Sequence, residues 1–126
     1  MGKKRTKKEL QTIEVFGGAL GEEVSVCAKF DLPLSVLALH VEGEWEKGDI
    51  RRLLDALRVA DLVAQPYPQE ILIALPNTSS AEARVVEQRL RDAVPEATLR
   101  VAAYTRGDTA EGLIELARHA SPREPS

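Results

Sequence analysis

The spacing of apolar residues along the chain changes between segments, which separates helices from strands. Between residues 9 and 30 apolar side chains recur every three or four positions, as in an amphipathic helix: Leu10, Ile13, Phe16, Leu20, Val24 and Cys27. Three glycines weaken this helix, because each costs about 1 kcal/mol relative to alanine. Residues 34–41 are apolar almost throughout and too short for an exposed helix. They predict a strand that is buried on both faces near the centre of a sheet.

The middle of the chain predicts a helix followed by a hairpin. A polar loop over 43–48 leads into a short apolar-periodic helix over 50–58. Two apolar runs, 61–64 and 70–75, then predict strands, and Gln-Pro-Tyr-Pro-Gln joins them. Prolines suit a turn better than a strand interior, and the short spacing favours a hairpin.

The last third predicts a helix, a strand and a final helix. Ser79 and Glu82 have the spacing of a capping box, and Pro95 ends the helix that they begin. Residues 99–103 alternate as a strand, and residues 110–117 carry the final apolar stripe. The central order is strand-helix-strand-strand-helix-strand. We therefore predict an α+β, ferredoxin-like fold with an extra N-terminal helix, its mostly antiparallel sheet covered on one face by helices.

Length and composition favour one soluble domain. The chain has 126 residues, of which 44% are hydrophobic and 29% charged, as in globular proteins. We expect a basic, flexible N-terminus over 1–8, the domain over 9–120 and a disordered tail over 121–126. The single cysteine, Cys27, excludes an internal disulfide framework. No apolar run approaches the roughly 20 residues that a membrane span needs, so we expect no span and, by default, a cytoplasmic protein.

The charge pattern argues against a nucleic-acid partner. Five of the 17 Lys and Arg residues fall within residues 3–8, although the net charge is −3. Such a segment is either an arm for nucleic acid or membrane, or a frayed, solubilising terminus, and we favour the second interpretation. The rest of the chain is acidic, and basic and aromatic residues do not interleave in it.

The segment from Arg58 to Pro76 resembles the GGDEF (diguanylate cyclase) family. Family members typically read R-x-x-D, five residues, the GGDEF or GGEEF signature, and then an apolar strand ending in proline. Here Arg58 and Asp61 match the first motif, and the signature positions hold Tyr67, Pro68, Gln69, Glu70 and Ile71. Segments on both sides keep the same register over nearly the whole chain. We interpret the chain as a degenerate member of this family.

This chain departs from the family pattern at the positions that the family uses for catalysis. The resemblance implies a reaction in which two GTP-loaded subunits attack each other's α-phosphate, with a carboxylate-bound divalent metal. The family places one carboxylate at the end of the first strand, where this chain has His40, and another at the third signature position, where it has Gln69. Imidazole and amide groups are poor ligands for magnesium. Glu42 and Glu70 lie nearby in the sequence, but neither replaces the lost pair.

Nucleotide binding is affected as well. The signature glycines let the backbone approach phosphates, whereas Tyr67 and Pro68 add bulk and proline removes a donor. The guanine-reading segment is shortened to residues 43–48, and the family's phosphate-binding residues of the last helix find no match. We therefore predict no catalytic residue, no metal and no cofactor. A residual enzyme acting on another nucleotide would need a glycine-rich phosphate loop or a carboxylate pair, and the sequence has neither.

Arg58 and Asp61 match the family's product-inhibition site, which implies cyclic di-GMP as a ligand. An arginine can bond or stack on guanine, and an aspartate can accept its N–H groups. The plainer interpretation is that Arg58 complements a helix dipole and that Asp61 caps a turn. Cyclic di-GMP binding is our preferred hypothesis for a non-catalytic regulatory domain in bacterial second-messenger signalling.

The alternative function is a protein-interaction scaffold, with a protein partner or a homodimer and no nucleotide. Trp45, Pro66, Tyr67 and Pro68 could then form an exposed apolar contact. For Trp45 we prefer a loop residue that folds onto the core. His40 is expected to be a hydrogen-bonded histidine beside the sheet rather than a metal ligand.

Overall fold

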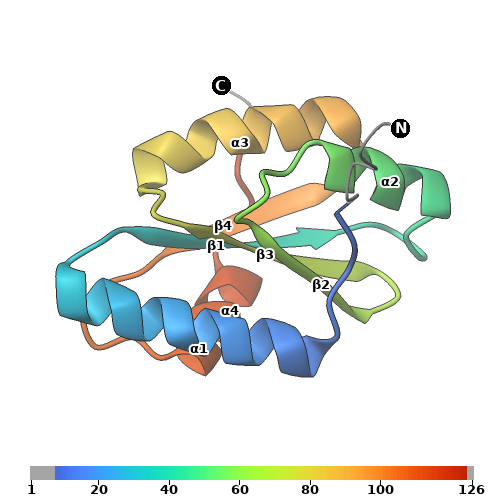
Figure 1. Ribbon diagram of the computed structural model, residues 1–126. Coiled ribbons are helices and arrows are strands. Elements are labelled where there is room, and N and C mark those ends of the chain that lie inside the picture. Colours follow the sequence, from blue (N-terminus) through green and yellow to red (C-terminus); the bar gives the residue numbers. More distant parts are fainter. Residues whose placement is uncertain (1–7, 125–126) are drawn as a thin grey trace, which may run out of the picture.

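Four strands form one antiparallel sheet, with helices on both of its faces (Figure 1). The computed structural model describes residues 8–124, and residues 1–7 and 125–126 lie outside the described part. The sheet order is β2-β3-β1-β4, which is the ferredoxin-like arrangement that the element order predicted. The elements are α1 (Ile13–Phe30), β1 (Leu34–His40), α2 (Lys47–Asp55), β2 (Leu62–Tyr67), β3 (Glu70–Pro76), α3 (Ser80–Ala93), β4 (Thr98–Ala103) and α4 (Ala110–His119).

Strand β1 lies at the centre of the sheet and separates two cores. Leu37 and Leu39 pack into a core with α2 and α3, whereas Val36 and Ala38 pack into a core with α1 and α4. Helices α2 and α3 cover one face of the sheet, as predicted. The prediction that helices cover only that face is wrong. A strand that is apolar on both sides requires both faces to be covered, and α1 and α4 cover the second face (Figure 1).

Helix α1 begins later than the apolar period indicated. Thr12 caps it by accepting a hydrogen bond from the backbone N–H of Val15, which satisfies one of the free donors of the first turn. The helix then runs unbroken to Phe30 and ends at Asp31, whose φ of 57° is left-handed. The three glycines neither break it nor allow a close approach, since a Cβ at any of them would meet nothing within 4 Å.

The hairpin of β2 and β3 is confirmed, but its turn is shorter than expected. Tyr67 pairs with Glu70, so only Pro68 and Gln69 form the turn. The sequence predicts Pro66 in the turn, whereas it lies inside β2. This is possible because β2 is an edge strand and its register shifts between Ala64 and Tyr67; proline is tolerated at edges and bulges.

The residues at both limits of the described part are better fixed than the sequence indicated, whereas the rest of the segments expected to be flexible or disordered, residues 1–7 and 125–126, lies outside it. The Lys8 ammonium donates to the backbone carbonyls of Val59 (2.9 Å) and Asp61 (2.6 Å), so the last residue of the basic segment is held against the domain. Arg123, in the tail expected to be disordered, bonds to α3 and β4. Within the described residues, no helix combines the length and apolar character that crossing a bilayer requires.

Candidate functional site

The turn between β2 and β3 is anchored to the loop that follows β1. The Pro68 carbonyl accepts the backbone N–H of Trp45 at 2.9 Å, and the Gln69 carbonyl accepts the Trp45 indole N–H at 3.1 Å. The backbone N–H of Val41 donates a third hydrogen bond, to the Gln69 carbonyl. Only 6% of Trp45 is exposed. Trp45 therefore folds onto the core and holds the turn, and it is not part of an exposed apolar contact.

The residues at the signature positions point in different directions. Tyr67 is 57% exposed, and its ring centroid lies 5.6 Å from the guanidinium carbon of Arg118. Ile71 is fully buried in the core on the α2 and α3 side. Pro68 and Gln69 are exposed at the turn. Of these side chains, Glu70 lines one hollow of the surface and Tyr67 lines another.

Glu70 forms a bidentate ion pair with α4. Arg118 donates from Nη2 to Oε1 at 2.7 Å and from Nε to Oε2 at 2.9 Å. The Glu70 side chain is only 14% exposed, and two parallel bonds of this kind are among the stronger polar contacts in proteins. The hydrogen bonds to Glu70 raise the pKa of Arg118 above its usual value. Both carboxylate oxygens of Glu70 are thus used by a cation of the same chain.

The hollow beside this pair has a volume of about 300 Å³ and is mainly cationic. It is lined by Ala38, Leu39, His40, Glu70, Arg100 and Arg118. His40 lies opposite Glu70 in the sheet register and is exposed. Glu42 lines a different hollow, with Glu44, Glu46, Asp49 and Glu96. The structure therefore does not bring Glu42 and Glu70 to one site.

The donors around His40 and Glu70 do not fit a magnesium ion. Magnesium prefers several free oxygen ligands in octahedral geometry. The only carboxylate that lines this hollow is Glu70, which Arg118 already occupies. Across residues 8–124, no three His, Cys, Asp or Glu side chains come close enough to hold a metal together.

Arg58 and Asp61 are close together and bonded to each other. The Asp61 carboxylate accepts the backbone N–H of Arg58 at 2.8 Å and the Arg58 guanidinium through Nε and Nη2 at 2.8–3.2 Å. Asp61 has no exposed side-chain surface, whereas the side chain of Arg58 is 42% exposed. Nη2 of Arg58 also donates to the Thr78 hydroxyl at 2.8 Å. Arg58 is the outward group of the pair, and Asp61 and Thr78 fix its plane.

Lys8 completes this cluster from the N-terminal side. It donates to the backbone carbonyl of Asp61, and its own carbonyl accepts from Nη2 of Arg51 at 2.7 Å. Burial lowers the pKa of the Lys8 ammonium, while the charge of Asp61 opposes that shift. Two cationic side chains, Lys8 and Arg58, thus lie close to the buried Asp61, and Arg51 bonds to the backbone of Lys8.

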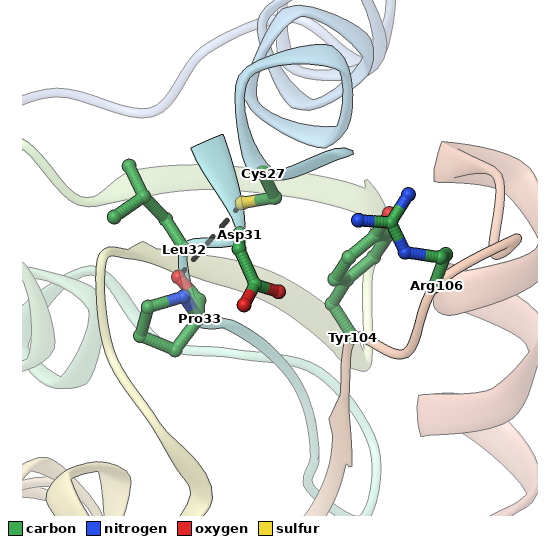
Figure 2. A pocket seen from close by; sticks show the side chains of 6 residues that line it. All are labelled: Cys27, Asp31, Leu32, Pro33, Tyr104 and Arg106. Carbon is green, nitrogen blue, oxygen red and sulfur yellow. Dashed lines mark hydrogen bonds between the residues drawn. The ribbon is translucent and has the colours of Figure 1, made fainter. Parts of the chain in front are cut away.

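A further hollow lies at the C-terminal end of α1 and contains none of the predicted site residues. It measures about 260 Å³ and is lined by Cys27, Asp31, Leu32, Pro33, Tyr104 and Arg106 (Figure 2). Cys27 forms part of its wall, with Sγ 3.8 Å from the Pro33 carbonyl oxygen. Burial raises the pKa of the Cys27 thiol, and Glu23 adds to the rise. A protonated, buried thiol is a poor nucleophile.

Sequence reasoning missed Arg118, Thr78 and Lys8 as members of these clusters. Arg118 follows Ile114 by one helical turn, so a helical wheel places it at the margin of the buried stripe of α4. That position indicates contact with the sheet, but not with Glu70 in particular. Thr78 and Lys8 lie 20 and 53 residues from their partners, and no local pattern marks them.

The fold is that of GGDEF domains. No protein-family model and no curated protein matches the sequence. Solved structures do match: the GGDEF domain of YfiN from Pseudomonas aeruginosa has a TM-score of 0.74 and 20% identity, over 86% of this chain and 80% of that one. Diguanylate cyclase SiaD of the same organism, in complex with its activator SiaC, has a TM-score of 0.81 and 21% identity, over 88% of this chain and 53% of SiaD. The GGDEF domain of DgcB from Caulobacter crescentus, in complex with c-di-GMP, has a TM-score of 0.75 and 11% identity, over 94% and 88%.

Proposed function

We propose that this chain, which has the GGDEF fold, is a catalytically inactive domain with a regulatory or binding role in bacterial second-messenger signalling. The ion pair between Glu70 and Arg118 carries the proposal. A cyclase of this fold needs free carboxylates at the hairpin and at the end of β1 to hold a metal. Here the hairpin carboxylate is bound by Arg118, and His40 ends the strand.

The turn itself also argues against holding a triphosphate. Pro68 has no N–H to donate, and the carbonyls of Pro68 and Gln69 already accept bonds from Trp45. Lone pairs on carbonyl oxygens repel phosphate oxygens, so this backbone offers no cradle for an anion. Metal binding and phosphate binding are therefore weakened by separate changes.

The proposal is tested by incubating the chain with GTP and magnesium, then manganese, and separating the nucleotides by chromatography. We expect no linear or cyclic dinucleotide product. The double variant His40→Asp/Gln69→Glu, which restores carboxylates at both positions, should also be inactive, because the turn and the base-reading segment stay altered. Dinucleotide formed by the unaltered chain would contradict the proposal.

Cyclic di-GMP at Arg58 is the ligand that we propose for this domain. The support is geometric: the guanidinium is partly exposed, and Asp61 and Thr78 hold its plane. A fixed, flat guanidinium can stack on guanine or bond its O6 and N7 edge. Because Asp61 is fully buried and already accepts from Arg58, we assign it the role of a positioning residue. DgcB, whose structure contains c-di-GMP, has the same fold.

Titration calorimetry with cyclic di-GMP tests this ligand. We expect saturable binding that Arg58→Ala abolishes and that Arg89→Ala, at an exposed arginine of α3, leaves intact. Arg58→Lys keeps the charge but loses the flat fork, so it should weaken binding strongly. No heat up to high micromolar ligand, or equal binding by Arg58→Ala, would remove this part of the proposal.

A protein-interaction scaffold is the second candidate, and an exposed hollow favours it. Ile13, Pro66, Tyr67 and Ile114 contribute apolar surface to a depression of about 390 Å³ between α1, the hairpin and α4. SiaD, which shares the fold, is in complex with a protein activator. Under this alternative, Tyr67→Ser should abolish binding of the protein partner, and cyclic di-GMP should have no effect on that binding.

A further inference from the structure

Residues 120–124, which we call the C-terminal strap, cross the edge of β4 and connect the two helical layers (Figure 1). At the start of the strap, the carbonyl of Ala120 accepts Nη1 of Arg100 at 2.5 Å. Further along, the backbone N–H of Arg123 donates to the carbonyl of Leu99 at 2.7 Å. The strap therefore occupies one backbone acceptor on the edge of the sheet.

The strap is held on its other side by α3. Arg123 donates from Nε and Nη2 to the two carboxylate oxygens of Glu87, at 3.0 and 3.2 Å. The Glu87 side chain is only 5% exposed, and Arg91 donates to the carbonyl of Arg123 at 2.7 Å. A buried carboxylate without its cation would be strongly unfavourable, so Glu87 fixes the position of the strap.

The backbone ladder shows which groups of β4 face outward. Tyr104 donates to the carbonyl of Leu34, and bonded pairs alternate along an antiparallel ladder. In the register of β1 and β4, the even-numbered residues of β4 therefore bond to β1, and Leu99, Val101 and Ala103 turn their N–H and C=O groups outward. Within residues 8–124, no hydrogen bond joins the outward groups of Val101 or Ala103 to another part of the chain.

The two edges of the sheet are protected differently. On the β2 edge, Pro66 and a register shift interrupt the strand, and Gln11 bonds to the Val63 carbonyl at 2.8 Å. These are devices by which proteins prevent edge-to-edge pairing. Strand β4 contains no proline and no bulge. Within residues 8–124, the only hydrogen bond to the outward groups of Leu99, Val101 and Ala103 comes from the strap.

We propose that the edge of β4 is an association surface for a second copy of this chain, and that the C-terminal strap limits this association. An antiparallel pair of β4 strands with Val101 on the two-fold axis places Leu99 opposite Ala103, so that all outward groups meet. Arg100 then lies opposite Ala102, and like charges do not face each other. A symmetric pair of this kind needs no partner other than the chain itself.

The strap blocks this register, because the register uses the Leu99 carbonyl that Arg123 occupies. A register shifted toward the end of β4 would use the backbone N–H of Thr105, which already donates to the Asp108 carboxylate at 2.8 Å. Only residues 101–103 stay open while the strap is in place. Since a short pair of strands is marginal in water, the intact chain is expected to associate weakly through this edge.

The test compares the intact chain with Arg123→Ala in sedimentation velocity over a wide range of concentration. The mass of one chain is 13.8 kDa, and Arg123→Ala should shift toward twice that mass at concentrations where the intact chain does not. Adding Val101→Pro should reverse the shift, because it removes an outward N–H without breaking a bond to β1. Val101→Thr, which keeps the N–H, should not reverse it.

Two results would overturn the inference: equal association of the intact chain and Arg123→Ala, or association that Val101→Pro does not reduce. If Arg123→Ala fails to fold, Glu87→Gln weakens the same attachment of the strap to α3 without leaving a buried charge. The same two outcomes then decide the test for Glu87→Gln. The inference does not depend on the proposed function, since binding of cyclic di-GMP at Arg58 is measured separately.

Discussion

Replacement of Asp61 removes a side chain of the candidate site that accepts four hydrogen bonds, all from Arg58. Asp61→Ala leaves the partly buried backbone N–H of Arg58 without its acceptor, and an unsatisfied group of this kind costs about 1–3 kcal/mol. The lost ion pair adds less than about 1 kcal/mol, because the Arg58 side chain is 42% exposed and solvent screens it. We therefore expect Asp61→Ala to lower the free energy of unfolding by about 3 kcal/mol.

Urea unfolding followed by the fluorescence of Trp45, the one tryptophan of the chain, measures this loss. With a slope of about 2 kcal/mol per molar urea, the unfolding midpoint should fall by about 1.5 M. Asp55→Ala is the matched control, because Asp55 forms an exposed pair with Arg51, and it should cost under about 0.5 kcal/mol. Equal stabilities of Asp61→Ala and Asp55→Ala would refute the assignment of Asp61 as a positioning residue.

Three further predictions concern other parts of the fold. Arg118→Ala should lower the free energy of unfolding by about 2–3 kcal/mol in thermal melts, since it leaves Glu70 poorly solvated and unpaired; a change below 0.5 kcal/mol, roughly the level of ordinary surface substitutions, would contradict this. Hydrogen bonds with Ser79 lower the pKa of Glu82 below its usual value. The stabilisation that the Glu82 carboxylate provides is therefore complete above the pKa of the unfolded state and is lost as the pH falls through the pKa of the folded state. Thermal melts from neutral to acidic pH should then show that the stability difference between Glu82→Gln and the intact chain shrinks. Because Cys27 is buried and the pKa of its thiol is raised, iodoacetamide should label it only after unfolding, and rapid labelling of the folded chain would contradict the burial of this thiol.

The elements and the capping of the fold were predictable because their signals are local. The run at 34–41 predicted a central strand, and β1 pairs with β3 on one side and β4 on the other. The spacing of Ser79 and Glu82 predicted a capping box that the structure confirms. The predicted burial of β1 on both faces also implies that helices cover both sides of the sheet. The ferredoxin-like analogy placed helices on one side only.

The contacts that define the candidate site were not predictable, because they join distant parts of the chain. Glu70 and Arg118 are 48 residues apart, and Lys8 and Asp61 are 53 apart. The position of Pro66 was predicted wrongly because it also depends on distant parts of the chain. Whether a proline fits in a strand depends on whether that strand lies at the edge of the sheet. The closeness of Arg58 and Asp61 was expected from their spacing, whereas the complete burial of Asp61 was not.

The central claim is that the hairpin from Tyr67 to Glu70 no longer holds a divalent metal with a nucleoside triphosphate. Electron paramagnetic resonance of Mn²⁺ tests it directly, since the sharp signal of the hydrated ion is lost when a protein coordinates it. With a non-hydrolysable GTP analogue present, adding the chain should leave the signal at the level set by the ion and the nucleotide alone. A further, saturable loss of the signal, abolished by Glu70→Gln, would contradict the account.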